Sequence, residues 1–247
     1  MAIVIKWCGI DFGQCLMDPS GLRNRLVIGD ICKELGEPEL INERIRRYRA
    51  LKEKYGSYSI IKEAHKDEIL TYVFDNNQEA MELFSAKEQE FLKPAPGVEE
   101  ALVYLNQQGI TVCVVCELKK TLGPIGTDVV TRFLQTQDLR RYFSRMISPQ
   151  GSINLRDGSV DASYKGLTKE AGTLYDRLVE DLRCQGIEPS EAATIGDKIT
   201  TDIDPPRKRG FRTIQYTGYI NFGASEADYT ISNFSQLKEI VQGETDV

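Results

Sequence analysis

Histidine is almost absent from this chain of 247 residues, because the only one, His65, lies in a run of charged residues. Chemistry that depends on a histidine acid or base therefore has a single candidate in an unfavourable place. Positive charge is not in excess either: 31 lysines and arginines face 37 aspartates and glutamates, so the formal net charge is −6. Nucleic acids bind basic surfaces, and we expect no nucleic-acid partner.

Long hydrophobic runs are also missing, so no segment is expected to span a membrane. The first residues do not resemble a secretion signal, because Lys6 interrupts their apolar stretch. Six scattered cysteines do not form a disulfide framework in a chain of this length. The pair Cys113 and Cys116 could be a redox pair or half a metal site, but small apolar residues of a buried strand explain Cys113 better. We expect reduced thiols, a cytoplasmic protein and no membrane partner.

Short apolar runs that alternate with amphipathic segments dominate the rest of the chain. This alternation predicts an α/β fold: a Rossmann-like parallel sheet with helices on both faces. The expected strands are Ile3–Ile10, Ile110–Val115, Met146–Ser148, Ala192–Ile195, Thr213–Tyr216 and Tyr229–Ile231. The expected helices are Gly97–Gln108, Thr127–Gln137, Lys169–Gln185 and Asp202–Arg209. A turn-rich loop or hairpin is expected at Gln150–Ala162, with Asp157-Gly158 at its tip.

Residues 18–91 break this alternation, because their apolar positions have a helical period and their turns carry glycine and proline. We predict a small all-helical domain at 18–91, inserted into an α/β core formed by 1–17 and 92–247. The segment Lys93–Gly97, with two prolines, is the expected return to the core. The inserted domain carries a basic cluster, which could be a solvated helix face paired with nearby glutamates or could turn one side chain inward to hold a phosphate or carboxylate. Its members are Arg44, Arg46, Arg47, Arg49, Lys52 and Lys54.

Polar side chains stand where the apolar strands end. Asp11 follows the first strand, Cys116 follows the second, and Asp197 follows the strand at Ala192–Ile195. Because the carboxyl ends of parallel strands share one edge, we expect these residues to meet there, together with Lys169 and Asp202. Two or three carboxylates and one ammonium group can hold a divalent cation beside an anionic substrate.

These islands resemble the motifs of the haloacid-dehalogenase-like (HAD) hydrolase superfamily. Asp11–Cys15 (DFGQC) corresponds to the family's Asp-x-Asp-Gly-Thr, and Cys116 stands where a Ser or Thr ends the next strand. Lys169–Tyr175 (KEAGTLY) matches the lysine that opens a helix, and Gly196–Asp202 (GDKITTD) matches the Gly-Asp…Asp motif in full. The resemblance extends over the whole chain, and the predicted helical insertion occupies the place of the family's cap domain.

The resemblance implies a magnesium-dependent phosphohydrolase that forms an aspartyl-phosphate on Asp11. The implied Mg²⁺ ligands are Asp11, the backbone carbonyl of Gly13 and Asp197, with Asp202 supporting the metal shell. Lys169 would pair with Asp11 and the phosphoryl oxygens. Cys116 would donate a weak hydrogen bond to the phosphate, since a thiol is a poor donor.

The first motif departs from the family at Gly13, where the second Asp normally acts as acid and base. Such assistance is worth roughly 10²–10⁴-fold in rate. Three functions therefore stay open: a phosphohydrolase for a small anionic metabolite with a good leaving group, a non-catalytic binding protein with the HAD fold, and a dehalogenase- or phosphonatase-like hydrolase of carbon–halogen or carbon–phosphorus bonds. The oligomeric state does not follow from the sequence.

Overall fold

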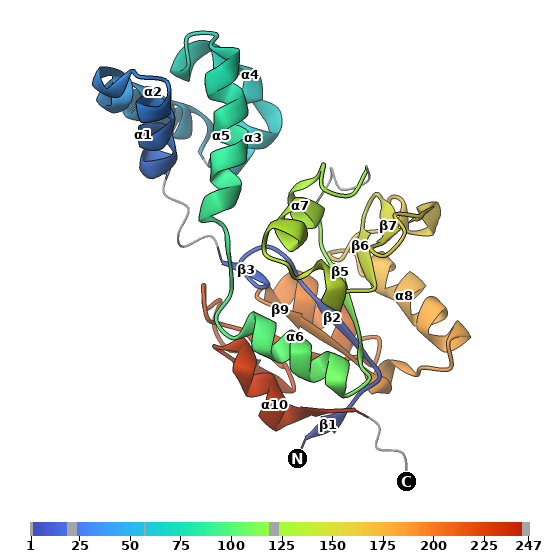
Figure 1. Ribbon diagram of the computed structural model, residues 1–247. Coiled ribbons are helices and arrows are strands. Elements are labelled where there is room, and N and C mark those ends of the chain that lie inside the picture. The colour runs from blue at the N-terminus through green and yellow to red at the C-terminus, as the bar shows by residue number, and fades with distance from the viewer. Residues whose placement is uncertain (1, 19–23, 57, 119–123, 244–247) are drawn as a thin grey trace. The chain divides into compact units, whose positions relative to one another are not determined.

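The computed structural model describes residues 2–18, 24–56, 58–118 and 124–243. The chain divides into two compact units: Met1–Asp18 with Lys93–Val247, named here the core unit, and Pro19–Leu92, the helical unit. Two short strands of the core unit mark where the chain leaves this unit and where it returns; Figure 1 labels the first of them, β3 (Met17–Asp18). The chain leaves the core unit after β3 and returns at β4 (Lys93–Pro94), and these two strands pair antiparallel.

An eight-stranded sheet forms the centre of the core unit, in the order β11-β10-β9-β2-β5-β6-β7-β8. The strands from β11 to β6 are parallel, and β7 and β8 add an antiparallel hairpin at one edge. Their bounds are β2 (Trp7–Ile10), β5 (Thr111–Val115), β6 (Arg145–Ser148), β7 (Gly151–Asn154), β8 (Val160–Asp161), β9 (Ala192–Gly196), β10 (Arg212–Tyr216) and β11 (Tyr229–Ile231). The predicted α/β class and the predicted hairpin are confirmed.

Helices flank this sheet, and one of them shows how an apolar stripe packs against it. In α8 (Thr173–Cys184), Leu174, Leu178 and Leu182 recur at every fourth position and pack with Trp7 and Ile147 of the sheet. The other helical segments of the core unit, within the described residues, are α6 (Val98–Gln107), α7 (Val129–Thr136), α9 (Asp204–Arg207) and α10 (Leu237–Ile240), the π-helix η6 (Ile199–Ile203) and the 3₁₀ turns η3 (Arg140–Tyr142), η4 (Ala162–Tyr164), η5 (Pro189–Glu191) and η7 (Phe234–Gln236).

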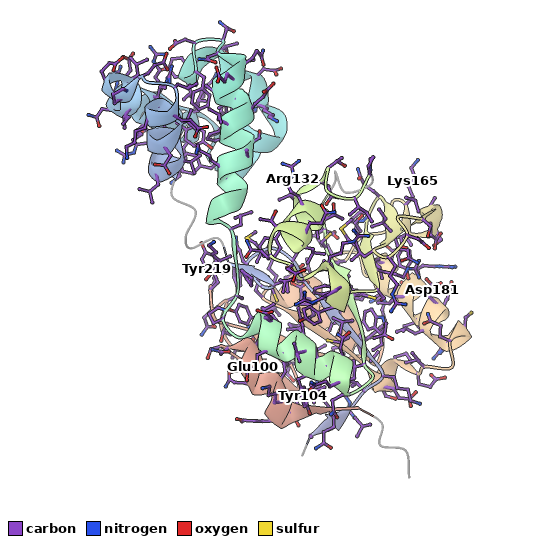
Figure 2. All side chains as sticks on the ribbon, viewed as in Figure 1. Glu100, Tyr104, Arg132, Lys165, Asp181 and Tyr219 are labelled. Atoms are coloured by element: carbon purple, nitrogen blue, oxygen red, sulfur yellow. The ribbon has the colours of Figure 1, made fainter. Side chains whose placement is uncertain are left out.

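The helix α6 is tied to the end of the described chain by two side chains that Figure 2 labels. The Tyr104 hydroxyl donates to the Val241 carbonyl at 2.8 Å, and Glu100 forms an ion pair with Lys238. These contacts close the face of the core unit that carries α6 and α10. No helix in the described part of the chain is long and apolar enough to cross a membrane.

The predicted first strand, Ile3–Ile10, is wrong as a single element. It divides into β1 (Ile3–Val4), which pairs with β12 (Val241–Gln242) in a separate two-stranded sheet, and β2. The division occurs because the Ile5 amide donates to Gln242 while the Lys6 amide donates to Glu191, so the backbone changes partners between two residues. Only β2 therefore delivers Asp11 to the edge of the main sheet.

The helical unit has an apolar core of its own. Its elements are α1 (Asn24–Glu34), η1 (Pro38–Leu40), α2 (Ile41–Tyr55), α3 (Tyr58–Ala64), α4 (Lys66–Glu68), the π-helix η2 (Ile69–Val73) and α5 (Gln78–Phe91). Tyr48, Phe74 and Phe84 meet in this core as edge-to-face aromatic pairs. Glycines at positive φ, Gly36 and Gly56, end α1 and α2 as the sequence predicts.

Candidate functional site

A tight turn after β2 positions Asp11. The Asp11 amide donates to the Ile195 carbonyl of β9 at 2.8 Å, so the residue stays in line with the sheet. The turn then closes on itself, because the Leu16 amide donates to the Asp11 carbonyl at 3.1 Å. Gln14 has a positive φ of 66° at its tip. The sequence of this turn departs from the family motif, yet it brings the Asp11 carboxylate to the carboxyl edge of the strands.

Close packing at the end of β9 places the Asp202 carboxylate near Asp197. A side chain at Gly196 would lie 2.3 Å from the Asp202 Cβ, so only glycine lets the π-helix η6 approach the strand end. The Asp202 carboxylate is then held by two donors, the Lys198 amide and the Thr201 hydroxyl, each at 3.1 Å. The spacing of Gly-Asp and Asp in the sequence therefore has a steric cause as well as a chemical one.

The ammonium group of Lys169 lies between two of these carboxylates. Its Nζ donates to Asp11 Oδ1 and to Asp202 Oδ1, each at 2.5 Å, and the residue is only 1% exposed. Burial opposes the charge, but the two neighbouring carboxylates outweigh it and raise the pKa of Lys169 well above its usual value. The raised pKa favours the protonated lysine, so the geometry places a cation between the two carboxylates.

The predicted start of the helix at Lys169 is wrong, because α8 begins at Thr173. Lys169 instead lies in a turn in which the Gly172 amide donates to the Lys169 carbonyl at 2.9 Å. Gly172 has a left-handed φ of 76°, which interrupts the helical backbone, and the Thr173 hydroxyl accepts from the Thr168 amide at 3.0 Å. A turn before α8 therefore positions the lysine, and the helix itself does not.

Asp11, Asp197 and Asp202 each offer a carboxylate oxygen to one point, and the three oxygens lie within 4.8 Å of one another. Asp197 is 1% exposed, and neither of its oxygens has a hydrogen-bond partner among the described residues. Burial, reinforced by the charge of Asp202, raises the pKa of Asp197 to about 6. Burial also raises the pKa of Asp11 to about 7, although Lys169 opposes the rise. A buried carboxylate without a partner beside two others fits a cation.

Two cysteine thiols lie around these oxygens. Cys116 directly follows β5 and is buried, and burial raises its pKa to about 12. Cys15 is buried in the turn after β2, and burial together with the negative charge of Asp11 raises its pKa well above the usual value. Both therefore stay protonated, so the anionic donors at this edge are oxygens. Hard oxygen donors favour magnesium over soft metals.

Gly13 leaves open space where the resembling family has its acid. A Cβ built on Gly13 would have no atom within 4 Å, and its φ lies outside the left-handed region. A side chain is therefore sterically possible at this position, and its absence is a chemical property of this site rather than a packing requirement. The Gly13 carbonyl as a metal ligand stays a prediction.

One residue that the sequence analysis did not assign, Glu117, also belongs to this edge. Both of its carboxylate oxygens accept from the Lys169 amide, at 3.2 and 3.0 Å. The signal that could have found it is the acidic residue directly after Cys116, at the end of a buried strand. By contrast, His65 belongs to the helical unit, where it stacks on Tyr55 with ring centroids 3.8 Å apart.

No family model and no curated protein matches this sequence. Solved structures match over nearly the whole chain. YfnB from Bacillus subtilis, named as a HAD-hydrolase and solved with magnesium, is 15% identical, with 96% of this chain and 98% of that chain covered and a TM-score of 0.58. A HAD phosphatase from Thermococcus onnurineus is 19% identical, with 95% of this chain and 97% of that chain covered and a TM-score of 0.54. A 2-haloacid dehalogenase from Pseudomonas syringae is 20% identical, with 96% of this chain and 97% of that chain covered and a TM-score of 0.52. The chain therefore has the HAD-like fold that its motifs predict.

Proposed function

We propose that this protein is a magnesium-dependent phosphohydrolase that acts on a small phosphorylated metabolite through an aspartyl-phosphate on Asp11. The observation that carries the proposal is the buried Asp197 carboxylate, which has no hydrogen-bond partner in the described chain and lies beside Asp11 and Asp202. Such a group is stable only if it is protonated or binds a cation. Bound there, Mg²⁺ would neutralise negative charge between the carboxylates and the phosphoryl oxygens.

The protein's own residues divide the reaction into two steps. In the first, an Asp11 carboxylate oxygen attacks phosphorus, and the bond from phosphorus to the leaving oxygen breaks. The protonated Lys169, 2.5 Å from Asp11 Oδ1, orients the nucleophile and balances charge on the phosphoryl group. Asp202 holds the same ammonium group from its other side. In the second step, water attacks phosphorus, which releases inorganic phosphate and regenerates the Asp11 carboxylate.

The missing acid at Gly13 restricts the substrate. The leaving oxygen departs without a proton from that position, so its conjugate acid must be much more acidic than an alcohol, as in acyl and aryl phosphates. The attacking water of the second step also lacks a base there, and general acid–base help is worth roughly 10²–10⁴-fold. Rates should therefore fall steeply from aryl to alkyl phosphates, and phosphate should accumulate on Asp11.

A non-catalytic binding protein is the second candidate, because Gly13 and Cys116 both replace groups that would assist turnover. The same carboxylates and Lys169 would then hold a phosphorylated ligand without cleaving it. Hydrolysis of a carbon–halogen bond is less well supported, because a nucleophilic carboxylate suffices for that reaction. It would leave no role for Asp197, which has no hydrogen-bond partner in the described part of the chain.

Phosphate release tests these alternatives. Acetyl phosphate, p-nitrophenyl phosphate and glycerol phosphate are supplied with and without Mg²⁺, and acid-quenched protein is examined for phosphate on Asp11. The proposal expects magnesium-dependent release from the first two substrates and trapped phosphate on Asp11. If neither the natural chain nor Gly13→Asp releases phosphate from any of them, the phosphohydrolase is ruled out. Binding of phosphate without release would then favour the binding protein, and halide release from 2-haloacids would favour the dehalogenase.

A further inference from the structure

Glu117 makes a contact that connects the end of β5 with the active lysine. Its Oε1 and Oε2 accept from the same Lys169 amide, at 3.2 and 3.0 Å, across 52 positions of the chain. The carboxylate contacts the lysine backbone, while the ammonium group of that lysine contacts Asp11 and Asp202. Glu117 therefore lies behind Lys169 and acts on the site through it.

The backbone of Lys169 has a particular need for such a contact. Lys169 precedes α8, and even the first turn of a helix leaves its amides without helical partners, so no helical hydrogen bond fixes the Lys169 amide. The residue is almost fully buried, so water cannot replace the missing partner. A long, flexible side chain reaches from this backbone to two carboxylates, so a small shift of the amide moves the ammonium group away from them.

The turn is already attached on its other side to the segment that carries Asp202. The Tyr175 hydroxyl donates to the Thr201 carbonyl at 2.9 Å. Arg209 donates to Asp176 at 2.6 and 2.8 Å and to the Pro205 carbonyl at 2.9 Å. These contacts connect the start of α8 to η6 and α9. Glu117 supplies the corresponding attachment to the neighbouring strand end.

We propose that Glu117 is a positioning residue, which holds the Lys169 backbone so that its ammonium group stays between Asp11 and Asp202. This inference rests on the proposed function for its consequence in phosphate binding, but the geometry of Lys169 can be measured without any ligand. Removal of the carboxylate should loosen the lysine, whereas replacement by an amide should preserve one acceptor oxygen.

The test compares Glu117→Ala, Glu117→Gln and a matched control, Glu170→Ala. Glu170 is exposed and next to Lys169, and no contact of it with the site is described, so its removal changes the charge without the hydrogen bonds. The ligand-free readout is the NMR signal of the Lys169 Cε–Nζ group. The ligand readout is calorimetric binding of orthophosphate in the presence of Mg²⁺.

Glu117→Ala should broaden or shift the NMR signal and weaken orthophosphate binding about tenfold. Glu117→Gln should change binding less than about threefold, and Glu170→Ala should leave both readouts unchanged.

A double-mutant cycle with Lys169→Met distinguishes positioning from a general structural role. If Glu117 acts through the lysine, Glu117→Ala should not weaken orthophosphate binding further once Lys169 is methionine. An equal effect in both backgrounds, or an equal effect of Glu170→Ala, would overturn the proposal. An unchanged Lys169 signal in Glu117→Ala would overturn it as well. Failure of the natural chain to bind orthophosphate with Mg²⁺ would contradict the proposed function, and the NMR comparison would still decide the role of Glu117.

Discussion

Each unit of the protein buries charge, but the two units balance it differently. In the helical unit, Arg44 is 3% exposed, and its guanidinium lies 2.7 Å from Glu37 and over the ring of Phe74. In the core unit, the Lys169 ammonium group contacts two of three clustered carboxylates, and the third, Asp197, is left without a hydrogen-bond partner among the described residues. In an ion pair the two opposite charges balance each other, whereas an excess of buried carboxylates costs free energy until protons or a cation neutralise it.

The same contrast applies to two members of the basic cluster in the helical unit. Arg44 does turn inward, as one interpretation allows, but its guanidinium pairs with Glu37 and donates to the Cys32 sulfur. Arg47 pairs with Glu43 and Asp75, each at 2.5 Å. These two arginines therefore serve the helical unit itself. The imbalance that could attract a ligand lies at the edge of the sheet.

The largest effect should come from Asp11→Asn, which removes the nucleophile but keeps the size of the side chain. Turnover of p-nitrophenyl phosphate should fall by roughly 10⁴-fold or more, to the level of buffer. The thermal unfolding of the variant should show that the fold survives. Magnesium-dependent turnover near the natural rate would assign the nucleophile to another group. It would also contradict the idea that the carboxylates of the core unit carry the chemistry.

Asp197→Asn should separate metal binding from stability. Magnesium affinity, measured by calorimetry, should fall about 100-fold, because a charged ligand becomes neutral. Without metal, above about pH 7, the variant should be at least as stable as the natural chain. The raised pKa of Asp197 means that its ionised form opposes folding, so removal of the charge relieves that cost. A clear loss of stability without metal would show that Asp197 has a structural role.

Arg44→Met should have the opposite effects to Asp197→Asn: it should lower stability and leave magnesium affinity unchanged. Loss of this buried partner leaves Glu37 uncompensated and should lower the free energy of unfolding by about 2 kcal/mol, measured in urea. Magnesium affinity should not change. The exposed Arg46→Met is the matched control, with an expected change within about 0.5 kcal/mol. Equal effects of the two substitutions would show that burial of Arg44 contributes nothing.

Gly13→Asp should partly restore the missing acid and base. Because the position has space for a side chain, the hydrolysis of alkyl phosphates should rise about tenfold, with less gain for aryl phosphates. Phosphate trapped on Asp11 should decrease. Gly13→Asn is the control, since it fills the same space without a titrating group. An equal gain from the asparagine would show that the effect is steric.

An effect of similar size concerns the pH dependence of magnesium binding. Protons compete with the metal, because the pKa of Asp11 is raised to about 7 and that of Asp197 to about 6. Magnesium affinity should therefore rise about tenfold between about pH 6 and about pH 8 and then level off. Calorimetry in matched buffers measures this slope and the protons released. Affinity that is independent of pH over this interval would mean that neither carboxylate binds the ion.

Much of the fold could be predicted because it depends on local patterns. Apolar runs locate β5, β9 and β10 within a residue or two, and helical periodicity indicates α6 and α8. Errors arose where a distant partner decides the structure. The first strand divides because its successive amides bond to Gln242 and Glu191, and the helix after Lys169 starts late because Gly172 interrupts it.

The sequence by itself determined the α/β class, the helical character of the described elements between Asn24 and Phe91, and the order in which Asp11, Cys116, Lys169 and Asp197 appear. Local periodicity and the identity of strand-end residues contain that information. Only the tertiary structure decided that the Lys169 ammonium group contacts Asp202 as well as Asp11, that Glu117 accepts a hydrogen bond from its backbone amide, and that Asp197 has no hydrogen-bond partner among the described residues. Lys169 and Asp11 are 158 positions apart, so their hydrogen bond and the pKa shifts of their neighbours exist only after packing removes the water between them.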